Sequence, residues 1–183
     1  PGDKRWRRGR LCTAGIDGVS RLDLFTLPES ERVELVRQFI LSGTPGPLLG
    51  HKHRKPNGGY RIITHDTTVE HAAGYLLHDV LAPLIRPQLT RKCLLYVQGR
   101  TLDTGITETI RVARRFKYVV TPDIRHFFDE ISWSHLRRLL EKLPLEPDLM
   151  DFIMAKVKAE IMMQDGPVTR QDRGVPQGLV LAP

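Results

Sequence analysis

The chain has 183 residues, of which 40% are hydrophobic, so it can bury the core of one domain or of one domain and part of a second. Its 28 lysines and arginines against 21 aspartates and glutamates give a net charge of +7. A basic surface favours a polyanionic partner, because side chains that neutralise phosphates release counterions. No run of about 18 apolar residues occurs, which predicts no transmembrane helix and no membrane partner.

The two cysteines argue against a disulfide-stabilised fold and against a cysteine-based zinc site. Cys12 and Cys93 lie far apart in the chain and neither belongs to a CxxC pair, so neither a disulfide framework nor a zinc ribbon is expected. His51 and His53 have no second pair at ligand spacing, so they do not predict a metal site. The first residues lack the apolar segment of a signal peptide, and they lack an initiating Met, which we interpret as processing or a fragment.

The first elements are predicted from charge and periodicity. Residues 1–13 predict a basic arm that contacts RNA through Lys4, Arg5, Arg7, Arg8 and Arg10. Residues 14–20 are rich in turn formers. A helix is predicted from Pro28 to Ser42, with Gly43 as its stop.

A β-hairpin is predicted over residues 47–64, with Asn57-Gly58-Gly59 as its turn. It places four basic side chains around a short turn: Lys52, Arg54, Lys55 and Arg61. Two readings stay open. The hairpin is either a flap that closes on a triphosphate, with forked contacts from Arg61, or a solvated charged hairpin. We also expect Lys52 to contact RNA.

The remaining elements alternate between helix and strand. Thr67 or Thr68 caps a long helix to Ile85, which Pro83 bends or shortens, and a second helix runs over 103–115. Residues 117–124 predict a strand buried on both faces. Helices from Ser132 or Ser134 to Leu143 and from Pro147 to about Lys158 follow, and then a hairpin over 161–170 turned by Asp165-Gly166. The mixture predicts an α+β fold.

Asp123 stands at the expected end of the 117–124 strand. Two-metal phosphoryl transfer needs carboxylates on rigid backbone, with the metal ions roughly 3.5–4 Å apart. Asp123 suits that task, and the backbone carbonyl of Ile124 offers a further oxygen ligand. The competing reading is that Asp123 only caps the turn that follows.

Two further patterns are ambiguous by themselves. Phe127 and Phe128 read as core residues, although Phe128 can instead lie beneath a sugar ring and exclude a ribose 2′-hydroxyl. In the block at residues 174–178, glycines permit close backbone approach and Gln177 carries an amide that can hydrogen-bond a nucleotide or a template strand.

The order of the motifs decides between these readings. The chain resembles the reverse transcriptases of group II introns and their bacterial relatives over nearly all of 14–183. The similar segments are AGIDGVS at 14–20, KPNGGYR at 55–61, LYVQGRT at 95–101, DIRHFFDEI at 123–131 and GVPQGLVLAP at 174–183. The first of these favours the intron-related branch.

The resemblance implies a right-hand polymerase with fingers at 14–116 and a partial palm at 117–183. It implies RNA-templated DNA synthesis with Mg²⁺, an RNA template, a DNA primer and a deoxynucleoside triphosphate (dNTP), in the cytoplasm of a bacterium. Asp123 with the Ile124 carbonyl would hold metal, and Phe128 would be the sugar gate. The triphosphate would be held by Arg61 with Lys55 or Arg54, and the nucleotide pocket would be shaped by Gln177 and Gly178.

The chain also departs from the family pattern. Pro122 precedes Asp123, and His65-Asp66 replaces a usual proline. The aromatic-x-Asp-Asp block is missing, and the sequence contains no Asp-Asp pair. We therefore expect the isolated chain to be inactive as a polymerase. The alternatives are a maturase-like module that binds RNA, including intron RNA, without catalysis, and a piece that forms a homodimer through its fingers.

Overall fold

The computed structural model describes residues 14–42, 44–56, 58–90, 93, 99 and 101–181. Several predictions lie outside the described residues. They are the basic arm at 1–13 with its five cations, the helix stop at Gly43, the turn residue Asn57, most of the motif at 95–101, and Ala182 with Pro183.

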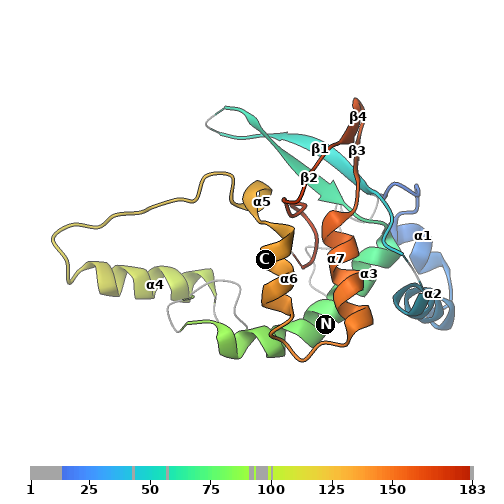
Figure 1. Ribbon diagram of the computed structural model, residues 1–183, viewed down its shortest axis with the longest axis horizontal. Coiled ribbons are helices and arrows are strands. Elements are labelled where there is room, and N and C mark those ends of the chain that lie inside the picture. Colours follow the sequence, from blue (N-terminus) through green and yellow to red (C-terminus); the bar gives the residue numbers. More distant parts are fainter. Residues whose placement is uncertain are drawn as a thin grey trace.

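The described chain alternates between helices and short strands (Figure 1). The elements are α1 (Arg21–Thr26), α2 (Glu29–Ser42), β1 (Leu48–Arg54), β2 (Tyr60–His65), α3 (Thr68–Ile85), the 3₁₀ turn η2 (Arg86–Gln88), α4 (Leu102–Ala113), α5 (Phe127–Glu130), α6 (Trp133–Leu140), α7 (Pro147–Lys158), β3 (Ile161–Met163) and β4 (Gly166–Val168). Both predicted hairpins form, and so do the predicted helices; α1 and α5 were not predicted.

The strands form one small mixed sheet in the order β2-β1-β3-β4. β1 pairs antiparallel with β2 and parallel with β3, and β3 pairs antiparallel with β4. Gly50 lies at the centre of the sheet, where an added Cβ would come within 2.5 Å of the Met163 sulfur and 2.7 Å of Ile161. The absence of a side chain there lets β3 approach β1 closely.

Two hydrophobic clusters support the sheet and the helices. One lies between α3, α6 and α7, which lie close together in Figure 1, and comprises Leu81, Leu140, Met150, Ile153 and Met154. The other lies beneath β1 and β3 and comprises Leu48, Ala159, Ile161 and Leu179. The fold is therefore mixed α+β, with the chain after β4 returning to the sheet through Leu179.

Local signals explain where the helices begin. Ser20 and Thr67 each accept a hydrogen bond from the backbone three residues ahead, and the acidic residue at that position bonds back to the cap, which completes a capping box. The predicted cap at Thr67 is confirmed. Pro83 lies inside α3, which continues to Ile85.

The predicted strand over 117–124 is wrong. These residues have no regular structure, and their apolar side chains face solvent: Tyr118 is 78% exposed, Val120 84% and Ile124 68%. A β-branched run becomes a strand only when a neighbouring strand supplies hydrogen bonds and a packed face covers it. No other described residues pair with this segment. In Figure 1 it is the long connection between α4 and α5, and α4 projects away from the sheet.

No helix among the described residues is both long enough and apolar enough to cross a bilayer.

Candidate functional site

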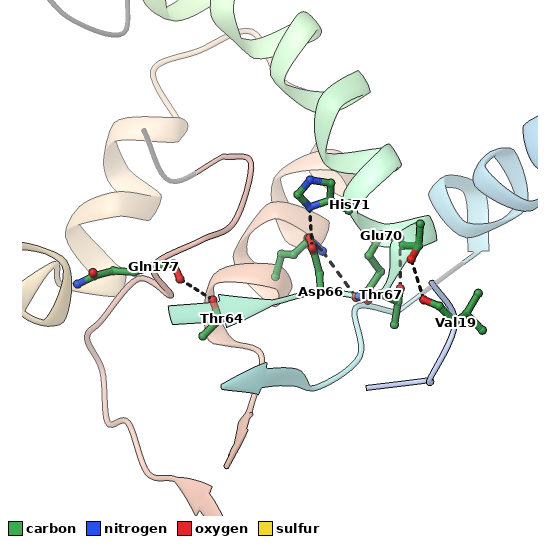
Figure 2. A network of polar contacts seen from close by, with 9 residues as sticks. Val19, Thr64, Asp66, Thr67, Glu70, His71 and Gln177 are labelled. Atoms are coloured by element: carbon green, nitrogen blue, oxygen red, sulfur yellow. Dashed lines mark hydrogen bonds and ion pairs between the residues drawn. The ribbon is translucent and has the colours of Figure 1, made fainter. Parts of the chain in front are cut away.

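The segment after β4 is anchored to β2. The main-chain carbonyl of Gln177 accepts a hydrogen bond from the Thr64 N–H at 2.7 Å and a second from the Thr64 hydroxyl at 3.0 Å. Thr64 is completely buried. Figure 2 shows the Gln177 carbonyl turned toward Thr64 and the Gln177 side chain extended in the other direction. The amide of Gln177 therefore stays available for a ligand.

Gly178 explains why the two segments approach so closely. Its φ is +119°, and a Cβ built on it would lie 2.3 Å from the carbonyl oxygen of Thr64. Any other residue would be strained in this conformation and would also collide with the β2 backbone. The structure thus gives Gly178 a role in placing the cavity wall.

A cavity of about 300 Å³ lies between β2 and this segment. Apolar side chains from the sheet form its base, and the stretch 169–177 forms one wall. Its lining consists of Ile62, Asp129, Ile161, Val168, Thr169, Arg170, Gln171, Arg173, Gly174, Val175, Pro176 and Gln177. Arg173 also pairs with Glu130 of α5 at 2.9 Å. The cavity combines an apolar base with amide, carboxylate and guanidinium groups.

Phe128 is tied to the cavity wall through its backbone. It lies on α5, and its carbonyl accepts a hydrogen bond from the Val175 N–H at 2.8 Å. Its ring meets Phe127 edge to face, with centroids 5.5 Å apart. The structure therefore brings together two motifs predicted from sequence, the one that carries Phe128 and the one that carries Gln177.

Asp123 and Ile124 do not join this group. Both are exposed on the connection before α5, and neither lines the cavity. The left-handed backbone of His126, at φ 52°, turns the chain between them and α5. The prediction that Asp123 stands at the end of a rigid strand fails together with that strand.

The basic residues of the hairpin lie on different faces. In the β1–β2 register, Lys52 is opposite Ile62 and Arg54 opposite Tyr60, whereas Arg61 is opposite His53. Because successive side chains alternate, Lys52 and Arg54 share the face of Ile62, and Arg61 points from the other face. Lys52 is further held by Asp165 at 2.8 Å. Lys55 follows β1 at the turn, where its N–H bonds the Gly59 carbonyl.

A comparison with known families shows the family of the chain. The family model for reverse transcriptase (RNA-dependent DNA polymerase) matches residues 53–183, which include the end of β1, the turn and β2 of the first hairpin, α5 and the Gln177 segment. The chain belongs to this reverse transcriptase family. A search of curated proteins finds no match.

Reverse transcriptases generally use divalent metal ions, so we asked whether the described residues fit one. Nowhere in the described ranges do three histidine, cysteine or acidic side chains come together as a metal site. Asp123 is exposed without such a group around it, and the His51 and His65 rings, 5.5 Å apart, have no third ligand. Asp123 with the Ile124 carbonyl does not by itself complete a metal site among the described residues, and no chemical step is routed through a metal ion.

A buried cluster of charged side chains joins α7 to the end of β2 and the start of α3. Lys156 of α7, 2% exposed, lies 3.1 Å from Asp66 and 3.8 Å from Glu70. The Lys156–Asp66 contact lies outside hydrogen-bond geometry, so charge attraction holds it. His71 bonds the other oxygen of Asp66 at 2.9 Å, as Figure 2 shows. Glu70 also accepts from the Gly46 N–H at 2.7 Å.

This cluster was missed by sequence reasoning, although two signals were present. One is His65-Asp66, which stands where the resemblance predicts a proline. Lys156 interrupts the apolar stripe of α7, among Ile153, Met154 and Val157, which are all buried. A lysine in such a stripe predicts a buried acidic partner, because an unpaired buried charge is costly.

We predict that Lys156→Met lowers the free energy of unfolding by about 3–5 kcal/mol, because it leaves Asp66 and Glu70 buried without a counter-charge. The measurement is urea unfolding at pH 7. Lys142→Met, which removes an exposed lysine after α6, is the matched control and should change stability by less than about 0.5 kcal/mol. Equal effects of the two variants would contradict the role of the cluster.

The same cluster predicts that the free energy of unfolding falls at acid pH. Burial alone would raise the pKa of Asp66, but the His71 hydrogen bond and the Lys156 charge outweigh it and hold this pKa below its ordinary value. The unfolded chain therefore takes up the proton first as pH falls. The stabilisation is complete above the unfolded pKa of about 3.9 and is lost as pH falls through the folded pKa. The free energy of unfolding should therefore fall less steeply between pH 6 and pH 2 in Asp66→Asn than in the wild-type chain. An equal pH dependence of the two proteins would refute the assignment.

Gly178→Ala should lower the free energy of unfolding by roughly 2–3 kcal/mol, since it adds a backbone clash to an unfavourable φ. Gly58→Ala is the control, because Gly58 has a positive φ of +83° but no atom near an added Cβ. The difference between the two decreases in the free energy of unfolding gives the cost of the clash with the Thr64 backbone. If both variants lose the same stability, the approach contributes nothing.

Proposed function

We propose that this chain is the nucleotide- and template-binding part of a bacterial reverse transcriptase of the group II intron type, with fingers at 14–116 and part of the palm at 117–183. The observation that carries the proposal is the Thr64–Gln177 anchor. It joins the fingers hairpin to the Gln177 motif and leaves a cavity between them. The intron-type branch is inferred from motif order alone.

The residues around the cavity are proposed to bind an incoming dNTP. The Gln177 amide contacts the base or sugar, and Gly178 keeps the wall close to β2. Phe128, on the neighbouring helix, is the candidate gate against a ribose 2′-hydroxyl. Arg61 is proposed to hold the triphosphate together with Lys55 at the hairpin turn. Arg54, the alternative to Lys55, emerges on the face of Ile62, which lines the cavity. Arg61 emerges on the opposite face and would meet the triphosphate where it extends beyond the edge of the hairpin.

The proposed parent reaction is RNA-templated DNA synthesis. The 3′-hydroxyl of a DNA primer attacks the α-phosphate of the dNTP, a new phosphodiester bond forms, and pyrophosphate leaves. Asp123, with the carbonyl of Ile124, remains the candidate ligand for Mg²⁺. What the described residues themselves supply is binding and orientation of the nucleotide, the part of phosphoryl transfer that depends on positioning.

We predict no primer extension by the 183-residue chain, because Asp123 has no neighbouring carboxylates that would complete a metal site among the described residues. The assay uses an RNA template, a DNA primer, Mg²⁺ and the four dNTPs. Asp123→Asn is the matched background. Extension by the wild-type chain above that background would overturn the prediction.

RNA binding is the second candidate function, favoured by the net charge of +7 and by the cations of the hairpin. It would occur without catalysis, as in a maturase-like module, and it includes intron RNA as a ligand. The basic residues at 1–13 and Lys52 are the proposed contacts besides Arg61. Self-association through the fingers is a separate proposal, which sedimentation over a range of concentrations tests.

Binding of single-stranded RNA should weaken with salt, and Arg61→Ala should reduce the slope of log affinity against log salt by about 0.7, the value for one lost phosphate contact. Removal of residues 1–10 should reduce it further, and Asp123→Asn should leave it unchanged. Arg138→Ala, an exposed arginine on α6, is the control for the loss of one charge. Binding that is indifferent to salt, or equally sensitive to Arg61 and Arg138, would refute the interface.

A further inference from the structure

Arg170 lies between the end of α7 and the cavity wall. Its guanidinium donates from Nη1 to the carbonyls of Val157 and Gly174, each at 3.0 Å, and from Nη2 to the carbonyl of Ala159. Val157 and Ala159 belong to the end of α7, where helical carbonyls lack partners within the helix. Only arginine carries enough donors in one rigid plane to reach all three oxygens. Arg170 therefore ties the end of a core helix to the wall.

Trp133, the first residue of α6, also bonds the Gly174 carbonyl. Its indole N–H donates to the Gly174 carbonyl at 2.8 Å, so that oxygen accepts from both Trp133 and Arg170. The Arg170 guanidinium and the Lys158 ammonium each lie 5.7 Å from the centre of its ring. A cation at this distance from an indole face is attracted to it.

The backbone of Gly174 is fixed on its other side as well. Its N–H donates to the Ile131 carbonyl at 2.9 Å, and the Val175 N–H donates to the Phe128 carbonyl at 2.8 Å. Gly174 has φ +98°, a conformation that favours glycine, while an added Cβ would meet only ordinary contacts. The main chain of 174–175 is thus bonded to α5 and its C-cap, to Trp133 of α6 and to Arg170, which in turn bonds the end of α7.

We propose that Arg170 and Trp133 are positioning residues for the nucleotide cavity. They fix the stretch 174–177 at its first end, just as Thr64 fixes it at Gln177. This inference rests on the proposed function only in taking a dNTP as the ligand of the cavity. Because the wall is held at both ends, little conformational entropy is lost in ordering it when the Gln177 side-chain amide binds a ligand. Such preorganisation increases the affinity for that ligand.

The contacts also connect the site to the core. Arg170 bonds the C-terminal end of α7, and Lys156, in the same turn of that helix, is paired with Asp66 at the end of β2. Both ends of the wall are therefore attached to the same pair of elements, α7 and β2, which the Lys156–Asp66 ion pair joins. Loss of Arg170 would free the first end alone, because the Thr64–Gln177 bonds do not depend on it.

Amide hydrogen exchange tests the clamp directly. In Arg170→Met, the amides of Gly174 and Val175 should exchange at least about tenfold faster, while amides in the middle of α3 and α7 keep their rates. Arg170→Lys, which keeps the charge but not the planar fork, should show a smaller increase. Arg138→Met is the matched control and should change none of these rates. Unchanged rates at Gly174 and Val175, or an equal increase throughout the chain, would overturn the proposal.

Trp133→Phe keeps the test valid if Arg170→Met fails to fold. It removes the indole N–H but retains an aromatic ring beneath the two cations. A selective increase in exchange at Gly174 and Val175 is expected again, smaller than that of Arg170→Met. The absence of any increase at these two amides would count against the clamp.

Nucleotide affinity separates positioning from simple stabilisation. Titration of the 183-residue chain with deoxyguanosine triphosphate should show about tenfold weaker binding in Arg170→Met and unchanged binding in Arg138→Met. Wild-type affinity in Arg170→Met despite faster exchange would overturn the positioning role. If the wild-type chain binds no nucleotide, the proposed function of the cavity fails, and hydrogen exchange alone then decides whether Arg170 and Trp133 clamp the wall.

Discussion

The two hydrogen bonds from Thr64 to the Gln177 carbonyl are the constraint on which the candidate site depends. They join segments 113 residues apart and are donated by the main-chain N–H and the hydroxyl of Thr64, a residue that is wholly shielded from water. An intramolecular hydrogen bond contributes about 1 kcal/mol net, but leaving a buried partner unpaired costs more. The anchor is therefore costly to break, and Gly178 lets it form by removing every side-chain atom from the contact.

Two polar groups give that anchor a fixed frame. Lys156 pairs with Asp66 and Glu70 inside the protein and joins α7 to the end of β2 and the start of α3. Arg170 joins the end of α7 to Gly174. Each is a cation that carries buried or half-buried contacts among otherwise apolar neighbours. Together they hold the hairpin and the Gln177 segment at a fixed separation, which the proposed nucleotide pocket requires.

Local signals predicted those parts of the fold that local physics decides. Three such parts are the capping residue Thr67, the helix beginning at Pro147 and the hairpin over 161–170. Each is present in the structure, although the hairpin turns at Gln164-Asp165, one residue before the predicted Asp165-Gly166. The segment 117–124 failed because strand formation depends on a partner that sequence periodicity does not reveal. The roles of Lys156, Trp133 and Arg170 depend on contacts between distant elements, so only the structure shows them.

The most direct test of the central claim is to locate a bound nucleotide. Amide chemical shifts of the 183-residue chain can be followed during titration with deoxyguanosine triphosphate. The account predicts that the shifts concentrate at Ile62, Val175 and Gln177, with little change along α4. Shifts that concentrate on another face, or no shifts at concentrations that saturate a nucleotide site, would contradict the assignment of this cavity.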